Sequence, residues 1–408
     1  MSSSVATHPV ALPAEPPLVL RVLVALSMSH LLNDAVQAML PAIYPLLKES
    51  FALTFAQIGL ITLVVQGVAS LLQPVVGLVT DRHPFPSSLV LGMGATLLGL
   101  IGLSQARAFS HLLVASAFVG FGSAIFHPEA SRLARRASGG RHGFAQSLFQ
   151  VGGNLGTALG PLLAAFIVMP RGQRHVLWFG ALALAAMFLL HRVSGWYRAG
   201  LAAEARQRGP KPTTVAVGTL PRRSVIRALA VLLALVFSKY VYLTSLTSFY
   251  TFYLMERFGV QAQSAQLLLF LFLLAVAVGT FAGGPFGDRF GRKPVIWFSI
   301  LGVAPFALVL PHVGLVAVAV LSVIIGLILA SAFSAILVYA QELVPGRVGL
   351  IAGLFFGVAF GIGGLGSAVL GWLADHTSME HVFLVCSALP LIGLLTVFLP
   401  AAPRRATG

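Results

Sequence analysis

Long apolar segments separated by short polar stretches recur along most of the chain. Each has about 20 residues, which is the length of helix that crosses the hydrocarbon core of a bilayer. Twelve such segments are predicted to be membrane-spanning helices, near residues 20–43, 54–79, 87–106, 109–133, 143–169, 174–193, 226–252, 264–286, 293–311, 314–341, 349–373 and 380–400. The pattern therefore predicts an all-α integral membrane protein.

The apolar pattern breaks once, midway along the chain. Residues 196–223 carry charges, Gly and Pro without periodicity, which predicts a linker between two sets of six spans. The expected domains are an N-terminal six-helix bundle over 18–195 and a C-terminal one over 224–400. Residues 1–17 and 401–408 are expected to be cytoplasmic tails. The first is predicted to be disordered, because it lacks the basic and apolar regions of a signal peptide.

The two halves share sequence features at a nearly constant offset. The stretch from Gly77 to Arg82 falls on Gly284 to Arg289 at an offset of 207, and Ser29 to Tyr44 falls on Ser238 to Tyr253 at 209. Six crossings are an even number, so both halves have the same orientation. Secondary transporters are built from such repeats and bind substrate near mid-membrane between them. We therefore expect two pseudo-symmetric bundles around a central site.

Composition and charge narrow the class further. The chain is 58% hydrophobic and 9% charged, with a net charge of +15. Twenty of the 26 Lys and Arg residues fall on one side of the predicted topology, which places both termini in the cytoplasm by the positive-inside rule. The basic residues are scattered over short loops, so no nucleic-acid partner is expected. The single cysteine, Cys386, excludes an internal disulfide and a cysteine-based metal site.

Ionisable residues inside the first span are candidates for function, because such groups are costly in a membrane and usually face a cavity. His30 and Asp34 lie one helical turn apart, with Asn33 beside them. Asp34 is too far from either end of its span to reach water, so it must pair, coordinate a ligand or take a proton. We expect it to carry the coupled proton. The alternative is that Asp34 only pairs with His30 or Lys239 and holds the halves together.

The fourth span ends in the polar stretch from Phe126 to Arg132. Pro128 removes a backbone hydrogen bond and opens polar backbone beside His127 and Glu129. We expect Glu129 to be the second candidate for the proton, and His127 and Arg132 to contact substrate. The alternative is an ion pair between Glu129 and Arg132, at i and i+3, that closes the helix end.

The fifth and seventh spans carry further polar groups. Lys239 lies deep in the seventh span, and an ammonium there needs a counter-charge from Asp34 or from a bound anion, unless it loses its proton. We expect Lys239 to hold the negative group of the substrate, for which the ionised Asp34 competes. The other predicted substrate contacts are hydrogen-bonding side chains: His30, Asn33, Gln150, Asn154 and Tyr240.

Two stripes of residues predict helix packing. Gly152, Gly156 and Gly160 recur at every fourth position of the fifth span, which permits close approach of a neighbouring helix. Ser70 and Gln73 share one side of the second span. These two either hold helices together by hydrogen bonds or contact substrate.

The stretch from Gly284 to Lys293, between the eighth and ninth spans, resembles the loop signature of the major facilitator superfamily. In that family the acidic residue helps to hold the cytoplasmic side closed, which implies this role for Asp288. The first-half copy has residues 83–86, His-Pro-Phe-Pro, where Gly-Arg-Lys would be expected. The resemblance implies a gate made by charged residues of the two copies: Asp81, Arg82, Asp288, Arg289 and Arg292.

Longer stretches are similar to the bacterial fosmidomycin resistance proteins over about residues 20–400. They include Ser29 to Asp34, Phe126 to Arg132, Phe149 to Asn154, Phe237 to Tyr240 and Ala330 to Glu342. The resemblance implies a monomeric, proton-driven exporter of a small anionic phosphonate antibiotic in the bacterial inner membrane. Its partners would be this substrate, protons and the lipid bilayer, and no cofactor is implied.

Two other functions remain open. The same fold could import an organic anion or a nutrient, since fold determines neither direction nor substrate. A polytopic membrane enzyme could use His30 and Asp34 as an acid–base pair. The two-fold repeat, the loop signature and the absence from the sequence of a nucleophile–base pair or a metal-ligand cluster argue against an enzyme.

Overall fold

The computed structural model describes residues 18–53, 55–168, 170–206, 221–260 and 262–400, and every regular element within them is helical. The predicted tails lie outside these residues, as does 207–220 of the predicted linker. The last helix of the first half runs on to Arg206, so the first part of that linker is helical.

The first half begins with α1 (Leu20–Ala42), the short α2 (Tyr44–Phe51), α3 (Phe55–Arg82), α4 (Ser88–Gln105) and α5 (Phe109–Arg136). It ends with α6 (His142–Leu163), its π-helical continuation η1 (Ala164–Val168), the 3-10 helix η2 (Gln173–Trp178) and α7 (Phe179–Arg206).

The second half begins with α8 (Arg222–Phe258), α9 (Ala262–Phe290), α10 (Arg292–Leu301), α11 (Ala304–Val309) and the 3-10 helix η3 (Leu310–His312). It continues with α12 (Leu315–Ala330), α13 (Ala332–Leu343), α14 (Val348–His376), α15 (Met379–Ser387) and the 3-10 helix η4 (Leu389–Phe398).

Each of the twelve predicted spans coincides with one helix or with consecutive helical segments. Eleven of these, among the residues that the structure describes, are long and apolar enough to cross a membrane. The remaining one is α6, whose hydropathy is lowered by Gln146, Gln150 and Asn154. The predicted all-α membrane fold is confirmed.

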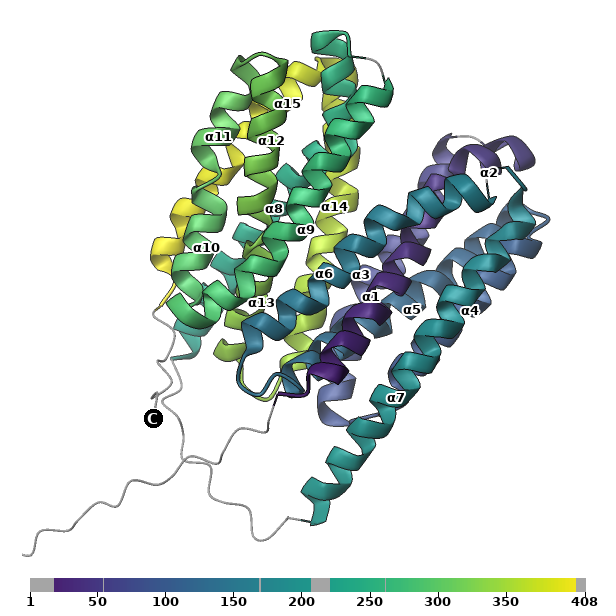
Figure 1. The fold of residues 1–408 in the computed structure, drawn as a ribbon, viewed down its shortest axis with the longest axis vertical. Coiled ribbons are helices and arrows are strands. Elements are labelled where there is room, and N and C mark those ends of the chain that lie inside the picture. Colours follow the sequence, from purple (N-terminus) through teal and green to yellow (C-terminus); the bar gives the residue numbers. More distant parts are fainter. Residues whose placement is uncertain (1–17, 54, 169, 207–220, 261, 401–408) are drawn as a thin grey trace, which may run out of the picture.

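The helices form two bundles that lie side by side (Figure 1). Contacts between the halves are made mainly by α3 with α14 and by α6 with α9. These two pairs are related by the internal repeat, since α9 is the counterpart of α3 and α14 of α6. The site between the halves is therefore bounded by two equivalent walls.

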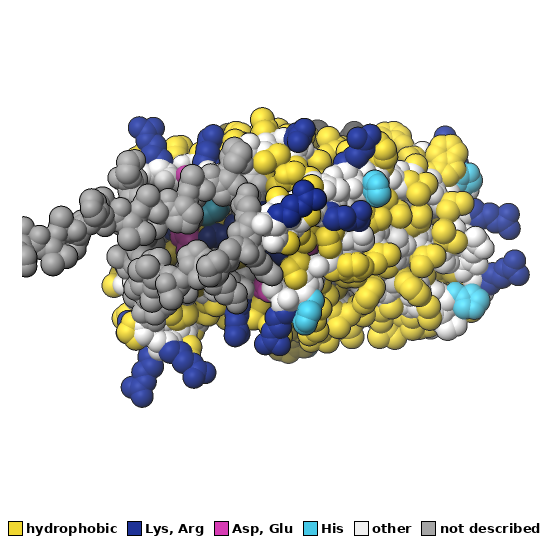
Figure 2. All heavy atoms as spheres, turned by 90° about the horizontal axis from the view of Figure 1, so that it is seen from below, with side chains coloured by type: hydrophobic (Ala, Val, Ile, Leu, Met, Phe, Trp, Pro, Cys, Tyr) yellow, Lys and Arg dark blue, Asp and Glu magenta, His cyan; other side chains and the backbone are white. Residues whose placement is uncertain are grey.

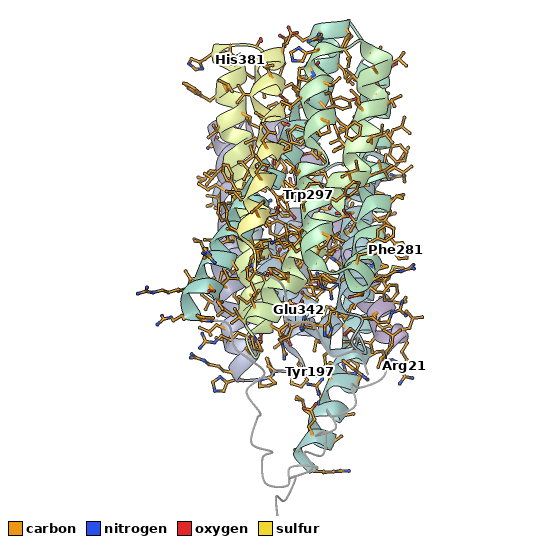
Figure 3. All side chains as sticks on the ribbon, turned by 90° about the vertical axis from the view of Figure 1, so that its left-hand side faces the viewer. Arg21, Tyr197, Phe281, Trp297, Glu342 and His381 are labelled. Atoms are coloured by element: carbon orange, nitrogen blue, oxygen red, sulfur yellow. The ribbon has the colours of Figure 1, made fainter. Side chains whose placement is uncertain are left out.

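One end of the molecule carries the start of α1, the end of α7, the start of α8 and the end of η4. We call it the linker end. The two bundles converge there and diverge toward the end that carries α2 and α15 (Figure 1). Seen along the long axis from the linker end, Lys and Arg side chains surround a largely hydrophobic surface (Figure 2). Arg21, Tyr197 and Glu342 lie toward the linker end and His381 at the opposite end (Figure 3).

The packing of α6 against α1 depends on glycine. A Cβ atom at Gly152 would overlap the carbonyl oxygen of Ser27, and one at Gly156 would overlap that of Leu31. Gly160, one turn further on, also lies against the backbone of α1. The predicted packing role of these glycines is confirmed, and it brings the two helices into backbone contact.

We expect Gly156→Ala to destabilise the protein by about 1–3 kcal/mol, because the added methyl group forces α6 away from α1. Thermal unfolding of the purified protein in detergent measures this. Gly195→Ala on α7 is the matched control, since no atom lies within 4 Å of its added Cβ and alanine favours a helix. Equal unfolding temperatures for the two variants would contradict the role of glycine in this contact.

Candidate functional site

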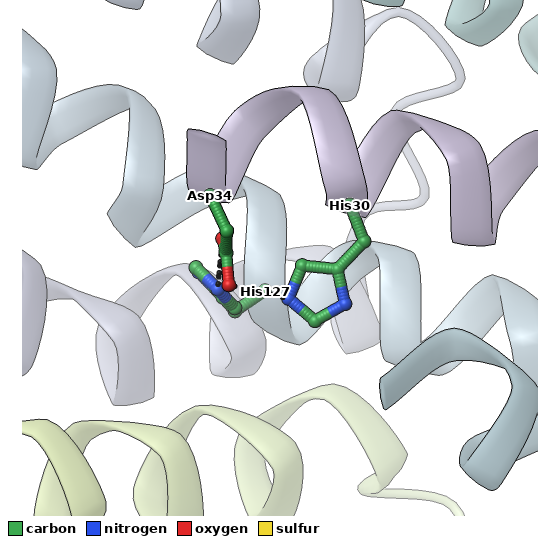
Figure 4. A group of neighbouring side chains, drawn as sticks. All are labelled: His30, Asp34 and His127. Carbon is green, nitrogen blue, oxygen red and sulfur yellow. Dashed lines mark ion pairs between the residues drawn. The ribbon is translucent and has the colours of Figure 1, made fainter. Parts of the chain in front are cut away.

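Asp34 lies at the centre of a buried cluster formed by α1 and α5. Its Oδ2 is 3.3 Å from Nε2 of His30, and its Oδ1 is 3.5 Å from Nε2 of His127 (Figure 4). Asn33 Nδ2 also donates to Oδ1 at 2.9 Å, and Gln37 Nε2 donates to it at 3.4 Å. The structure thus joins three predicted site residues, which we call the Asp34 cluster: His30, Asp34 and His127.

Backbone carbonyl oxygens favour the same tautomer in both histidines. Nδ1 of His30 is 2.8 Å from the carbonyl oxygen of Phe149. Nδ1 of His127 is 3.1 Å from the carbonyl oxygen of Ser123 and 3.3 Å from the Ser123 hydroxyl, which can accept from the same ring hydrogen. A carbonyl oxygen only accepts hydrogen bonds, so each Nδ1 carries a hydrogen, and a neutral imidazole has no second one. Each Nε2 then directs a lone pair at the carboxylate of Asp34. Each contact becomes attractive only when a proton or a metal ion lies between the nitrogen and the carboxylate oxygen.

The Asp34 cluster has the composition of a cation site. Among the described residues, it is the one group of His, Cys, Asp and Glu side chains close enough to share an ion, with ligand atoms within 4.8 Å of one another. Such a set can accept protons or a metal ion. The cluster could not be recognised in the sequence, because His127 is far from Asp34 along the chain and only the fold joins them.

Aromatic rings enclose the cluster. The His30 ring stacks on Phe149 of α6, with the centroids 4.0 Å apart. The His127 ring lies against Phe356 and Phe360 of α14, at centroid distances of 5.2 and 5.0 Å. Because α14 belongs to the second half, the cluster sits where the two bundles meet.

A second polar site, the Lys239 pocket, is a hollow lined by residues of α6, α8, α9, α12 and α13. Its polar lining residues are Gln150, Asn154, Lys239, Tyr240 and Thr280. Lys239 is 4% exposed, and its Nζ lies 5.4 Å from the ring centroids of Tyr240 and Phe333. Asn154 Nδ2 donates to Thr280 Oγ1 at 2.8 Å. The structure therefore gathers three predicted substrate contacts, Gln150, Asn154 and Tyr240, around the buried amine of Lys239.

Lys239 is not paired with Asp34, as one interpretation of the sequence required. Within the described part of the chain, no ion pair involves Lys239, and the partners of Asp34 are the two histidines. Rings supply the only close electrostatic contacts of the ammonium among these residues. A buried charge without a counter-charge is costly, so the amine of Lys239 is suited either to bind an anion or to lose its proton.

Helix α6 contributes residues to both the cluster and the pocket. Phe149 and Gly153 face the cluster, where a Cβ at Gly153 would lie 2.5 Å from the His30 ring. The next residues in the chain, Gln150 and Asn154, line the pocket. Residues four apart lie on one face of a helix, whereas successive residues point about 100° apart. Phe149 and Gly153 therefore face one site, and Gln150 and Asn154 face another. Movement of α6 therefore affects both.

Glu129 and Arg132 belong to neither site. The Nε atom of Arg132 donates to Glu129 Oε2 at 2.9 Å, and Nη2 donates to Oε1 at 2.5 Å. Nη2 also donates to the hydroxyl of Tyr197 at 2.8 Å. The geometry favours the ion pair that the i, i+3 spacing offered as an alternative. Tyr197 was missed because it lies in the predicted linker.

Asp288, at the end of α9, connects the two halves at the linker end. It accepts hydrogen bonds from the backbone N–H groups of Gly143, at 3.0 Å, and Phe144, at 2.8 Å, in the first turn of α6. It also pairs with Arg292 at 2.7 Å, and Arg292 reaches Glu342 at 3.3 Å. A carboxylate of one half thus caps a helix N-terminus of the other.

Asp81, at the end of α3, makes the equivalent contact. It accepts from the N–H groups of Gly349, at 2.8 Å, and Leu350, at 2.9 Å, in the first turn of α14. Arg82 and Arg289, which were expected beside the two aspartates, are exposed at the surface. At the linker end the two halves are therefore joined by two carboxylates, each on a helix N-terminus of the other bundle.

Small residues allow the halves to close at this end. A Cβ at Gly77 would overlap the backbone of Gly349, and one at Gly284 would overlap that of Gly143. Further along the same wall, Ser70 Oγ donates to the carbonyl oxygen of Gly357 on α14 at 2.8 Å. For Ser70 the structure favours the predicted packing role.

Sequence comparisons agree with the two-bundle geometry. The family description Major Facilitator Superfamily matches residues 26–255 and 232–408. The chain belongs to the major facilitator superfamily. It is therefore a membrane-embedded transporter of small molecules and not an enzyme.

Two relatives and one solved structure define the similarity further. The fosmidomycin resistance protein of Escherichia coli (strain K12) is 59% identical over 93% of this chain and 92% of its own. An uncharacterized MFS-type transporter, YfnC, of Bacillus subtilis (strain 168) is 44% identical over 93% of each chain. The crystal structure of the superfamily transporter FucP in the outward conformation has a TM-score of 0.68 at 16% identity, over 93% of this chain and 98% of that chain.

We expect Asp288→Asn to open the linker end of this superfamily transporter, because it removes a charged acceptor from two N–H groups. The loss is about 1.5–3 kcal/mol, so the open population rises about tenfold or more. Ser147→Cys, buried on α6 beside Gly284, reports the opening through maleimide labelling in a Cys386→Ser background.

Glu380→Gln is the control for this labelling, since it removes an ion pair at the opposite end. It should leave the labelling rate unchanged. If the Ser147→Cys reporter is labelled at the same rate with Asp288 and with Asp288→Asn, this carboxylate does not hold the linker end closed.

Proposed function

We propose that this protein is a proton-coupled exporter of a small anionic antibiotic, fosmidomycin or a similar phosphonate, working by alternating access. One observation carries the proposal. The amine of Lys239, which has no anionic partner, and a histidine–carboxylate cluster that can accept protons both adjoin α6. The name of the 59% identical relative supports the choice of substrate.

The Lys239 pocket suits a phosphonate. A phosphonate presents three acceptor oxygens and at least one negative charge, and charge-assisted hydrogen bonds to it are strong. Lys239 supplies the charge, and Gln150, Asn154 and Tyr240 supply hydrogen-bond donors from two sides of the pocket. The rings of Tyr240 and Phe333 exclude water from the ammonium, which strengthens its attraction for an anion.

The Asp34 cluster suits the proton. Its two histidine–carboxylate contacts are favourable only when protonated, and Asn33 and Gln37 orient the carboxylate. Glu129 remains the second candidate, although it is already paired with Arg132.

The coupling we propose acts through α6. Protonation of His30 strengthens its bond to the Phe149 carbonyl and draws α6 toward α1. Substrate bound to Gln150 and Asn154 draws α6 toward α8 instead. Binding of the proton therefore weakens binding of the substrate, and binding of the substrate weakens binding of the proton. This is the negative coupling that an exchanger needs. This replaces the direct competition for Lys239 that the sequence suggested.

We propose that the linker end faces the cytoplasm of a bacterium, with bundles 18–195 and 224–400 joined there by 196–223. The excess of Lys and Arg on that side supports this orientation. The conformation, closed by Asp81 and Asp288, is then outward-facing. The substrate would enter from the cytoplasm after this gate opens. We propose that one chain suffices for the cycle.

A second candidate is an importer that carries an organic anion and protons in the same direction. The observation that favours it is charge, because an anion bound at Lys239 attracts protons to nearby groups. The sign of the coupling distinguishes the two candidates.

We expect Asp34→Asn to abolish gradient-driven export of fosmidomycin and to leave binding measurable, with a flattened pH dependence, because the central carboxylate of the proton site is gone. Inverted proteoliposomes with an imposed pH gradient measure transport, and titration calorimetry measures binding. If Asp34→Asn still concentrates fosmidomycin at the wild-type rate, the proton is carried elsewhere and Glu129 is tested next.

We expect Lys239→Met to weaken fosmidomycin binding about 10- to 100-fold, because it removes a charged donor of about 1.5–3 kcal/mol and keeps the side-chain volume. Arg198→Met, an exposed substitution on α7, should bind normally. Wild-type affinity in Lys239→Met would exclude the pocket as the anion site.

A further inference from the structure

The Asp34 cluster has two separate places for a proton. Nε2 of His30 faces Oδ2 of the carboxylate at 3.3 Å, and Nε2 of His127 faces Oδ1 at 3.5 Å. The contacts use different oxygens and different rings. One proton between His30 and Oδ2 would still leave a lone pair of His127 Nε2 facing a lone pair of Oδ1. A single proton therefore makes only one of the two contacts attractive.

No neighbouring group supplies the missing proton. The Nδ1 hydrogens point to the carbonyl oxygens of Phe149 and Ser123, and the Ser123 hydroxyl, 3.3 Å from Nδ1 of His127, can accept from the same ring hydrogen. Asn33 and Gln37 donate to Oδ1, but their amides do not titrate.

The helices packed around the cluster add no further charge to it. Gly153 of α6 contacts the carboxylate, and Phe356 and Phe360 of α14 contact His127. Two titratable residues of α8, Lys239 and Tyr240, line the pocket and do not contact the cluster. Among the described residues, His30 and His127 are the titratable side chains in contact with Asp34.

We propose that the Asp34 cluster exchanges two protons for each substrate molecule, one in each histidine–carboxylate contact. The inference rests on the proposed export function and adds its stoichiometry. Two protons change the cluster from a net charge of −1, with neutral rings, to +1, with two imidazolium ions around a carboxylate. His30 and His127, expected from the sequence to contact substrate, are thereby assigned to the proton.

The stoichiometry sets how steep a substrate gradient the protein can sustain. At zero membrane potential, net flux stops when the substrate ratio equals the proton ratio raised to the number of protons exchanged. Exchange of two protons lets a tenfold proton gradient balance a hundredfold gradient of substrate. Exchange of one proton balances only a tenfold gradient.

The test measures this exponent in proteoliposomes loaded with fosmidomycin. Potassium and valinomycin hold the membrane potential at zero, a fixed pH gradient is imposed, and the fosmidomycin ratio is varied until net flux stops. We expect an exponent of two for the wild type. His30→Gln and His127→Gln should each give one, because the glutamine amide donates to Asp34 without titrating.

His191→Gln, an exposed substitution on α7, is the matched control and should give two. The difference between wild type and variant counts the protons held by the protein, whatever proton the phosphonate itself carries.

Four results would overturn the inference. A wild-type exponent of one refutes it while leaving proton-coupled export intact, and an exponent of zero refutes the proposed function as well. An exponent of two that persists in both histidine variants places the second proton elsewhere. Loss of transport on treatment with EDTA, restored by zinc alone, shows that the three side chains hold a metal ion instead.

Discussion

The backbone contact between α1 and α6 determines both polar sites. Glycines at the contact let the helices approach until Gly153 lies against His30 and Asp34. At that separation the Phe149 carbonyl reaches Nδ1 of His30 and fixes its tautomer. The same contact fixes the rotation of α6, and with it the direction of Asn154 toward the Lys239 pocket. A larger residue at these positions would move the Asp34 cluster and the Lys239 pocket together.

Closure at the linker end follows from an equally local constraint. Two carboxylates each cap a helix N-terminus of the other bundle, where unpaired N–H groups and the helix dipole favour a negative charge. The two contacts are not equal, because Asp288 also has Arg292 and Asp81 has no ion-pair partner among the described residues. Hydrogen bonds to a charged group contribute about 1.5–3 kcal/mol each. A ligand that binds more tightly to the conformation open at the linker end can overcome a closing free energy of this size.

Much of the fold and part of the site could be predicted from the sequence. Span positions follow from hydrophobic length, and the two bundles follow from the repeat. Asp34, Lys239 and Asp288 stand out because charge is rare in apolar segments. Partners are harder to predict. Periodicity gives the face of a helix but not the neighbour or the depth at which the two meet, so the pairing of Asp34 with His127 depended on the fold.

The same limit explains the remaining differences. Arg292, and not Arg289, meets Asp288, because the chain turns at Gly291 between α9 and α10 and brings the first residue of α10 back to the carboxylate. Arg132 turns to Glu129 and Tyr197 because α7 continues beyond its apolar segment. Length and hydropathy mark where a helix crosses the membrane, but they do not show how far it continues into water.

The central claim is that protons on the Asp34 cluster and an anion in the Lys239 pocket hinder each other across α6. Proton exchange with solvent when fosmidomycin is added tests it most directly. Purified protein in detergent is placed in weak buffer with a pH indicator, and saturating fosmidomycin at the same pH is mixed in. Our account predicts that the protein releases protons. Proton uptake would contradict it, because protons and fosmidomycin would then bind together and be carried in the same direction.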